Sequence, residues 1–225
     1  MARCAWTRTD PAGDGVVVRY PTTVTSERYL SEQLWRTATL ERCPLHPEGG
    51  CGLCGHGSYG RVRPVGLRVA RFLCPEAGVT ISLLPDFLAS RLSGTLSEVE
   101  AVVEAAEAAA SQEAALEQVR PAAAADAVTL PSGLRWLRRL LSGVHAALVV
   151  AVTLVPSLSE CRPTLAALRE RLGAPEVLVT LRQVADAHLS VMSRPLGFRA
   201  RARKRNSERK RTPHEVGPDP PQQAR

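Results

Sequence analysis

The chain has 225 residues and a formal net charge of +7 at pH 7, which is enough length for one substantial core or two small ones. Most of the excess charge falls in residues 194–211, where nine basic side chains accompany one acidic side chain, so the remainder is close to neutral. No signal-peptide pattern opens the chain, because residues 1–10 are polar and no suitable apolar run follows. We therefore expect a cytoplasmic protein whose cysteines bind metal or stay reduced.

Residues 1–42 form an N-terminal lead with two expected elements. The valine-rich residues 16–20 predict a short strand. Residues 26–40 place apolar side chains at helical spacing, which predicts a helix capped by Ser26 or Ser31. We interpret Tyr29 and Trp35 in this helix as core residues. The alternative is an aromatic platform for nucleic-acid bases.

Residues 43–90 predict a zinc-ribbon-like β-hairpin. Four of the six cysteines and two of the five histidines fall within residues 43–74, and clusters of these soft ligands are typical of tetrahedral zinc sites. Two candidate strands, residues 57–62 and 67–73, are joined by the turn-forming sequence Arg63-Pro-Val-Gly66. Together with the helices expected over residues 91–193, this hairpin gives a fold class that is mainly α with a small β-ribbon at the N-terminal side.

The ligand set stays open at this point. A complete second Cys-x2-Cys pair would need a ligand at position 77, where the chain has Ala77. The candidate ligands are Cys51, Cys54 and Cys74, with Cys43, His46 or His56 as the fourth. Such a set could hold one Zn²⁺ tetrahedrally. The alternative is a metal-free ribbon in which Cys43, His46 and Cys74 no longer bind a metal.

Several motifs follow one another along this part of the chain. They are Cys43-Pro-Leu-His46-Pro, His56-Gly-Ser-Tyr59, Arg68-Val-Ala-Arg-Phe-Leu-Cys74-Pro, Ser82-Leu-Leu-Pro-Asp-Phe87-Leu and Gly94-Thr-Leu-Ser-Glu-Val-Glu100. With these motifs, residues 43–158 resemble an uncharacterised bacterial family related to insertion-sequence transposases. The resemblance implies a zinc-ribbon-like segment followed by a helix-turn-helix, and DNA binding of transposase origin.

Residues 91–193 predict a helix-turn-helix within a helical bundle. Ser97 and Glu100 have the spacing of a capping box at the start of a first helix. Ser111 can cap a second helix, which Pro121 would end. Small alanine side chains let such short helices pack closely, as a helix-turn-helix requires.

After a low-complexity loop over residues 122–130, Ser132 is expected to cap a third helix over residues 133–141. Arg135, Arg138 and Arg139 share one side of this helix, and its leucines lie on the other. Arginines on one helix face can contact DNA phosphates or guanine edges, with Trp136 as an anchor. The alternative is a solvated basic face on a bundle helix.

The remaining helices complete the expected bundle. Residues 143–155 are strongly apolar but fall short of the roughly 20 residues of a membrane span. We therefore predict a buried core helix there, and we interpret His145 as a core or edge histidine rather than a ligand. Residues 164–172 and 176–192 supply two further amphipathic helices.

Residues 194–225 have no apolar periodicity and are expected to be disordered when free. Their basic side chains can neutralise phosphates without reading a base sequence. The candidates are Arg199, Arg201, Arg203, Lys204 and Arg205. The alternative is a solubilising tail.

These features together predict a binding protein and not an enzyme. The sequence has no Gly-rich phosphate loop, no Gly-x-Ser-x-Gly elbow and no His-Glu-x-x-His helix. With the resemblance, we expect a DNA-binding repressor or accessory factor that lacks a catalytic nuclease domain. We expect no binding to a membrane and no small-molecule substrate. A homo-oligomer is possible. The alternative is a helical interaction or oligomerisation module whose basic tail binds an acidic partner.

Overall fold

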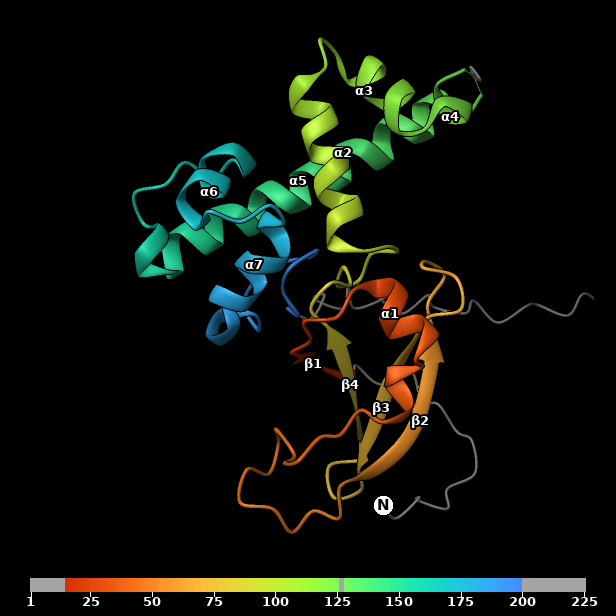
Figure 1. Ribbon diagram of the computed structural model, residues 1–225, viewed down its shortest axis with the longest axis vertical. Coiled ribbons are helices and arrows are strands. Elements are labelled where there is room, and N and C mark those ends of the chain that lie inside the picture. The colour runs from red at the N-terminus through yellow and green to blue at the C-terminus, as the bar shows by residue number, and fades with distance from the viewer. Residues whose placement is uncertain (1–14, 126–127, 200–225) are drawn as a thin grey trace, which may run out of the picture.

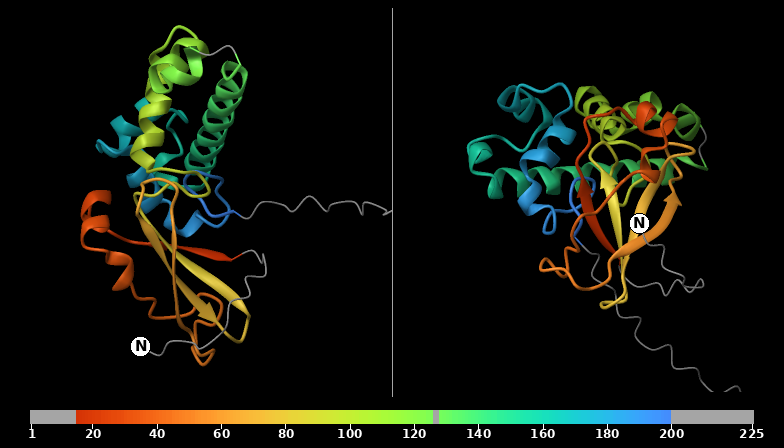
Figure 2. Two further views of the ribbon diagram at one scale, coloured as in Figure 1. Left: turned by 90° about the vertical axis from the view of Figure 1, so that its right-hand side faces the viewer. Right: turned by 60° about the horizontal axis from the view of Figure 1, so that its bottom comes forward.

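The computed structural model describes residues 15–125 and 128–199, which form a β-sheet part and a helical part (Figure 1). Each part has its own hydrophobic core, one around the strands and one around the long helix α5 (Leu130–Leu154). In both views of Figure 2 the sheet stands on one side of the helices, with one end of its strands pointing toward them. The expected combination of helices with a β-structure is thus confirmed, but the β-structure is a four-stranded sheet and not a two-stranded ribbon.

The sheet has four strands in the order β1-β4-β3-β2. They are β1 (Val16–Tyr20), β2 (Cys54–Gly60), β3 (Arg68–Cys74) and β4 (Val79–Pro85). β2, β3 and β4 form an antiparallel meander that contains the predicted hairpin, and β1 joins β4 in parallel, with Val16 opposite Ile81. The sequence analysis did not predict β4, although Val79, Ile81 and Leu83 alternate with Thr80 and Ser82 as in a half-buried strand.

The predicted helix over residues 26–40 is interrupted. α1 (Ser26–Ser31) is capped by the Thr25 hydroxyl and not by a serine. Gln33 then adopts a left-handed conformation before the 3-10 helix η1 (Leu34–Arg36). Tyr29 and Trp35 lie in the core of the sheet part, where the Tyr29 ring also contacts Phe87. Their interpretation as core residues is therefore confirmed.

The helical part is organised along α5, which Figure 1 shows passing α2 near its middle. The elements around it are α2 (Leu96–Ala108), α3 (Gln112–Val119), α4 (Pro121–Ala125), η2 (Pro156–Leu158), α6 (Leu165–Leu172), α7 (Val177–Val184) and η3 (Asp186–His188). α3 and α4 lie near the first half of α5, and α6 and α7 lie near its second half (Figure 1). α4 falls within the stretch that was expected to be a loop.

α5 is one continuous helix, which corrects the prediction of two helices over residues 133–141 and 143–155. Ser132 does not cap it but lies in its first turn, where its hydroxyl donates to the Thr129 carbonyl oxygen. A Cβ at Gly143 would lie 3.4 Å from the Arg194 carbonyl oxygen, so this glycine serves a close packing contact rather than helix termination.

By length and composition, α5 is the one helix in the described part of the chain that could cross a membrane. Its residues Val144, Ala147 and Leu148 are buried in the core of the helical part. Val149 on the other face is 38% exposed, so this half of the helix is buried on one side only, which corrects the prediction of a fully buried core helix.

The capping residues of α2 and α3 test two sequence patterns. The capping box of α2 is formed by Thr95 and Glu98, which corrects the pairing of Ser97 with Glu100. Glu100 is buried and accepts hydrogen bonds from two backbone amides at the start of α7. Ser111 caps α3 as predicted. These caps do not by themselves make α2 and α3 a helix-turn-helix, and that motif stays a prediction.

Arg182 on α7 joins the helical part to the sheet part. Its side chain is 0% exposed, and its guanidinium donates to five backbone carbonyl oxygens. These belong to Pro85 at the end of β4, to Asp86 and Leu88 just after it, and to Pro195 and Leu196 near the end of the described chain. Burial lowers the pKa of Arg182 to about 9, so the group is still protonated at pH 7.

The carboxylate beside this junction belongs to Asp86, which is 1% exposed. Arg19 of β1 donates to both of its oxygens, at 2.7 and 2.9 Å. Bidentate pairs of this kind combine charge with fixed geometry. Asp86 and Arg182 therefore connect β1, the end of β4 and α7 through one network.

Replacing Arg182 with methionine should destabilise the protein by at least about 3 kcal/mol. The reason is that several buried carbonyl oxygens lose their donor, at roughly 1–3 kcal/mol each when unsatisfied. Arg182→Lys should give an intermediate loss, because an ammonium group has three donors and not five. Urea unfolding measures both. Exposed Arg162 provides the control, since Arg162→Met should change stability by less than about 0.5 kcal/mol. An Arg182→Met protein as stable as this control would contradict the role assigned to Arg182.

Candidate metal centre

Four potential metal ligands meet at the end of the sheet that lies away from the helices (Figure 1). They are Cys43, His46, Cys51 and Cys74, and their ligand atoms all lie within 4.8 Å of one another. Three of them come from the long connection between η1 and β2, and Cys74 is the last residue of β3. The three cysteines are buried and His46 is half-buried.

Tight turns bring these residues together. The His46 amide donates to the Cys43 carbonyl oxygen at 3.1 Å, and the Gly49 amide donates to the His46 carbonyl oxygen at 3.0 Å. Gly49, Gly50 and Gly52 all have positive φ angles, which glycine adopts without steric cost. This geometry turns the chain back so that Cys51 approaches the end of β3.

The spacing of the ligand atoms suits a tetrahedral ion. His46 Nδ1 lies 3.7 Å from Cys43 Sγ and 3.3 Å from Cys74 Sγ. Metal–sulfur and metal–nitrogen bonds of about 2.3 and 2.0 Å at a tetrahedral angle place the two ligand atoms about 3.5 Å apart. The four side chains therefore could hold a metal ion with little rearrangement.

The electrostatics of the group favour one thiolate among the three cysteines. Burial raises the pKa of Cys43, but hydrogen bonds from the His46 ring, from nearby backbone amides and from Cys51 outweigh it, so the pKa falls to about 7. The pKa of Cys51 is raised, first by burial and then by its contact with Cys43. Since thiolates are the form that binds metal, Cys43 is the thiol best prepared for coordination.

A carboxylate lies on the other side of the histidine ring. His46 Nε2 is 3.6 Å from an Oε2 oxygen of Glu76, in the turn between β3 and β4. Metal-binding histidines commonly direct their second ring nitrogen to a carboxylate, which orients the ring. Glu76 is thus placed to support His46, a role that the sequence analysis did not assign.

The structure does not bring every candidate ligand into this group. Cys54 begins β2, where it pairs with Leu73, and it is disulfide-bonded, which corrects the expectation that the cysteines bind metal or stay reduced. His56 lies within β2 and is not among the four grouped ligands. The Cys-x2-Cys spacing gave no sign that a strand begins at its second cysteine, whereas the Cys-x2-His spacing marked Cys43 and His46 correctly.

The arginines predicted to contact nucleic acid lie apart from this centre. Arg135, Arg138 and Arg139 are all exposed on α5, and Arg138 donates to the Gln112 side chain at 2.8 Å. Trp136 is half-buried, and the Arg120 guanidinium lies 3.7 Å from the centroid of its ring. Arg199 is exposed. The tail candidates Arg201, Arg203, Lys204 and Arg205 fall outside the described residues.

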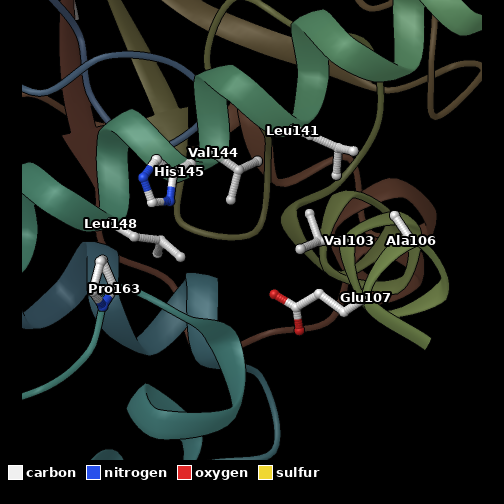
Figure 3. A pocket seen from close by; sticks show the side chains of 8 residues that line it. All are labelled: Val103, Ala106, Glu107, Leu141, Val144, His145, Leu148 and Pro163. Carbon is white, nitrogen blue, oxygen red and sulfur yellow. The ribbon is translucent and has the colours of Figure 1, made fainter. Parts of the chain in front are cut away.

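A small pocket of about 210 Å³ opens between α2, α5 and the start of α6 (Figure 3). Its walls are mostly apolar, and Figure 3 shows Glu107 on one side and His145 on the other. Burial, followed by the charge of Glu104, raises the pKa of Glu107. His145 is exposed at this pocket, which agrees with its interpretation as an edge histidine.

In comparisons with known proteins, no protein-family model, no curated protein and no solved structure matches the chain. The resemblance of residues 43–158 to a transposase-related family therefore stays a prediction.

The purified protein should contain about one tightly bound metal ion per chain. Cys51→Ser should lower the metal content at least about tenfold, because it removes one of the four grouped ligands. Cys54→Ser should leave the content unchanged, since Cys54 lies outside the group. Elemental analysis by mass spectrometry after gel filtration measures each protein.

Cys161→Ser is the matched control, because Cys161 lies on the helical part, between η2 and α6. Equal metal loss in the Cys51 and Cys54 variants would contradict the ligand set seen here. A metal-free wild-type protein that takes up no added metal would reject the centre altogether.

Proposed function

We propose that this protein binds DNA through the basic face of α5, while a zinc-stabilised ribbon supports that face. It would act as a repressor or accessory factor of insertion-sequence origin, without a catalytic nuclease domain of its own. The observation that carries the proposal is that Arg135, Arg138 and Arg139 are all exposed on one side of α5. None of the three forms an ion pair within the described residues.

The geometry of an α-helix explains why these three charges act together. Residues three and four positions apart lie on the same face, about 5–6 Å apart at their Cβ atoms. Arg135, Arg138 and Arg139 have this spacing. Three guanidinium groups at such distances, without a carboxylate partner among the described residues, repel one another, and a polyanion relieves that repulsion while releasing its own counterions.

α5 is also a helix of suitable dimensions for a DNA groove. The major groove admits an α-helix, and arginine can pair with the O6 and N7 atoms of guanine. In the proposed arrangement α5 is the recognition helix, with α2 and α3 as supporting helices of a helix-turn-helix. Arg138 is held at the start of α3 by Gln112, so its position on this face is partly fixed before binding.

The proposed metal is Zn²⁺, and its role is structural. Three thiols and one imidazole match the closed tetrahedral sets of structural zinc sites, and all four coordination positions are filled by the protein. Zn²⁺ has no redox chemistry of its own. It would fix the connection between η1 and β2 to the end of β3, and so keep the sheet part rigid beneath the helices.

The proposal predicts DNA binding that weakens steeply with salt. Replacing Arg135, Arg138 and Arg139 with alanine in the full chain should reduce the slope of log affinity against log salt by about 2–3, because each lost phosphate contact removes about 0.9. Fluorescence anisotropy with a mixed-sequence duplex at several salt concentrations measures the slope.

A triple variant of equal charge change provides the control. Arg28, Arg162 and Arg171 are exposed and lie outside α5, so their replacement with alanine should change the slope by less than about 1. No binding of wild-type protein to duplex DNA would overturn the proposal. If both triple variants weaken DNA binding equally, α5 is not the contact face. That result would favour an interaction module whose tail binds acidic partners.

A further inference from the structure

Three arginines outside the predicted set lie beside α5 or next to an arginine that contacts it. They are Arg63 in the loop between β2 and β3, Arg120 at the end of α3, and Arg194 after η3. Arg63 and Arg120 are exposed, and Arg194 is half-buried. Each comes from a different part of the chain, so no sequence pattern links them.

The β2–β3 loop, which carries Arg63, lies at the end of the sheet that faces the helices (Figure 1). Its carbonyl oxygen accepts a hydrogen bond from the Gly94 amide at 3.2 Å, just before α2. The neighbouring Arg61 side chain donates to the carbonyl oxygens of Ala89 and Leu92. These contacts attach the β2–β3 loop to the segment that leads into α2, and so fix where Arg63 is presented.

Arg120 is held on the first half of α5 by an aromatic contact. Its guanidinium lies 3.7 Å from the centroid of the Trp136 ring, a cation–π distance. Burial first, and then the positive charge of Arg63, lower the pKa of Arg120. The two arginines are therefore close enough to repel each other, although one belongs to the sheet part and the other to the helical part.

Arg194 extends the same face toward the middle of α5. Its Nε atom lies 3.8 Å from the position that a Cβ of Gly143 would occupy. Arg135, Arg139 and Gly143 follow one another at intervals of four residues, so they line one side of the helix. Trp136 is three residues before Arg139 and adjoins that line.

We propose that Arg63, Arg120 and Arg194 join Arg135 and Arg139 in one composite phosphate-binding surface that crosses from the β2–β3 loop to α5, and that its ligand is the backbone of a nucleic acid. This inference rests on the proposed DNA binding and identifies where a second part of the backbone would lie. Within the described residues, none of the five arginines forms an ion pair with a carboxylate.

The chemistry of the surface favours a phosphate backbone over an acidic polypeptide. Guanidinium groups bind phosphate oxygens in pairs, and a regular backbone presents one such charge after another along its length. The five arginines are spread along α5 and beyond it to the sheet part, which suits a long ligand with repeated charges. A single small anion would engage only one part of this surface.

The test compares two double variants of the full chain. Arg63→Gln with Arg120→Gln removes both charges, and Arg63→Lys with Arg120→Lys retains them. Binding to the same duplex is measured against salt by fluorescence anisotropy. The glutamine pair should lower the slope of log affinity against log salt by about 2 and weaken binding on the order of 10–100-fold at low salt. The lysine pair should keep most of the slope.

The outcomes separate this inference from the proposed function. If the Arg135, Arg138 and Arg139 variant loses slope but the glutamine pair does not, α5 binds DNA and the composite surface is wrong. If both double variants lose slope equally, the loss does not come from charge, and the inference fails. Thermal melting of each variant shows whether weaker DNA binding is caused by unfolding. If the glutamine pair is unfolded, the single variant Arg63→Gln, on an exposed loop, replaces it in the same salt titration.

A polyglutamate peptide is the remaining probe. The protein could bind polyglutamate but not duplex DNA, with polyglutamate binding dependent on Arg63 and Arg120. That result would overturn the nucleic-acid assignment in favour of an acidic protein partner. Weak polyglutamate binding beside strong duplex binding supports the inference.

Discussion

The guanidinium of Arg182 is the interaction on which the arrangement of the two parts depends. It supplies donors to carbonyl oxygens after β4 and near residue 195, in a place closed to water, where each of those oxygens requires a partner. Asp86 lies beside it and offsets part of the cost of burying its charge, although this carboxylate is also paired with Arg19 of β1. With this network in place, the sheet cannot turn freely against α7. The composite surface requires this fixed relation, because Arg63 and α5 belong to different parts.

The metal centre lies at the opposite end of the strands, where it would stabilise the connection between η1 and β2. The connection from η1 to β2 has almost no regular structure, and a small sheet core gives such a segment little to pack against. Ligation of Cys43, His46 and Cys51 with Cys74 would attach it to β3 directly. The sheet part is then held at both ends, by a metal at one and by buried polar groups at the other. Between them lies an apolar core that includes Tyr29 and Leu67.

Sequence patterns identified the features whose causes are local. The β2–β3 hairpin, the Ser111 cap and the helical spacing of Arg135, Arg138 and Arg139 were all readable, because each depends on residues a few positions apart. Four of the six candidate ligands also come together, and the exceptions are His56 and the disulfide-bonded Cys54. The pairing of β1 with β4, the continuity of α5 through Gly143 and the burial of Arg182 could not be predicted. Each of these is set by a partner far along the chain, and a single sequence carries no record of which partner that is.

The parallel pairing of β1 with β4 has a consequence for synthesis on the ribosome. Val16 pairs with Ile81 and Val18 with Leu83, so β1 leaves the ribosome well before the strand that receives it. At roughly 5–20 residues per second, that interval lasts several seconds. During it, a valine-rich segment is exposed with its backbone unpaired, which is the condition under which nascent chains associate wrongly. Shielding of this first strand until β4 is made should therefore favour correct folding.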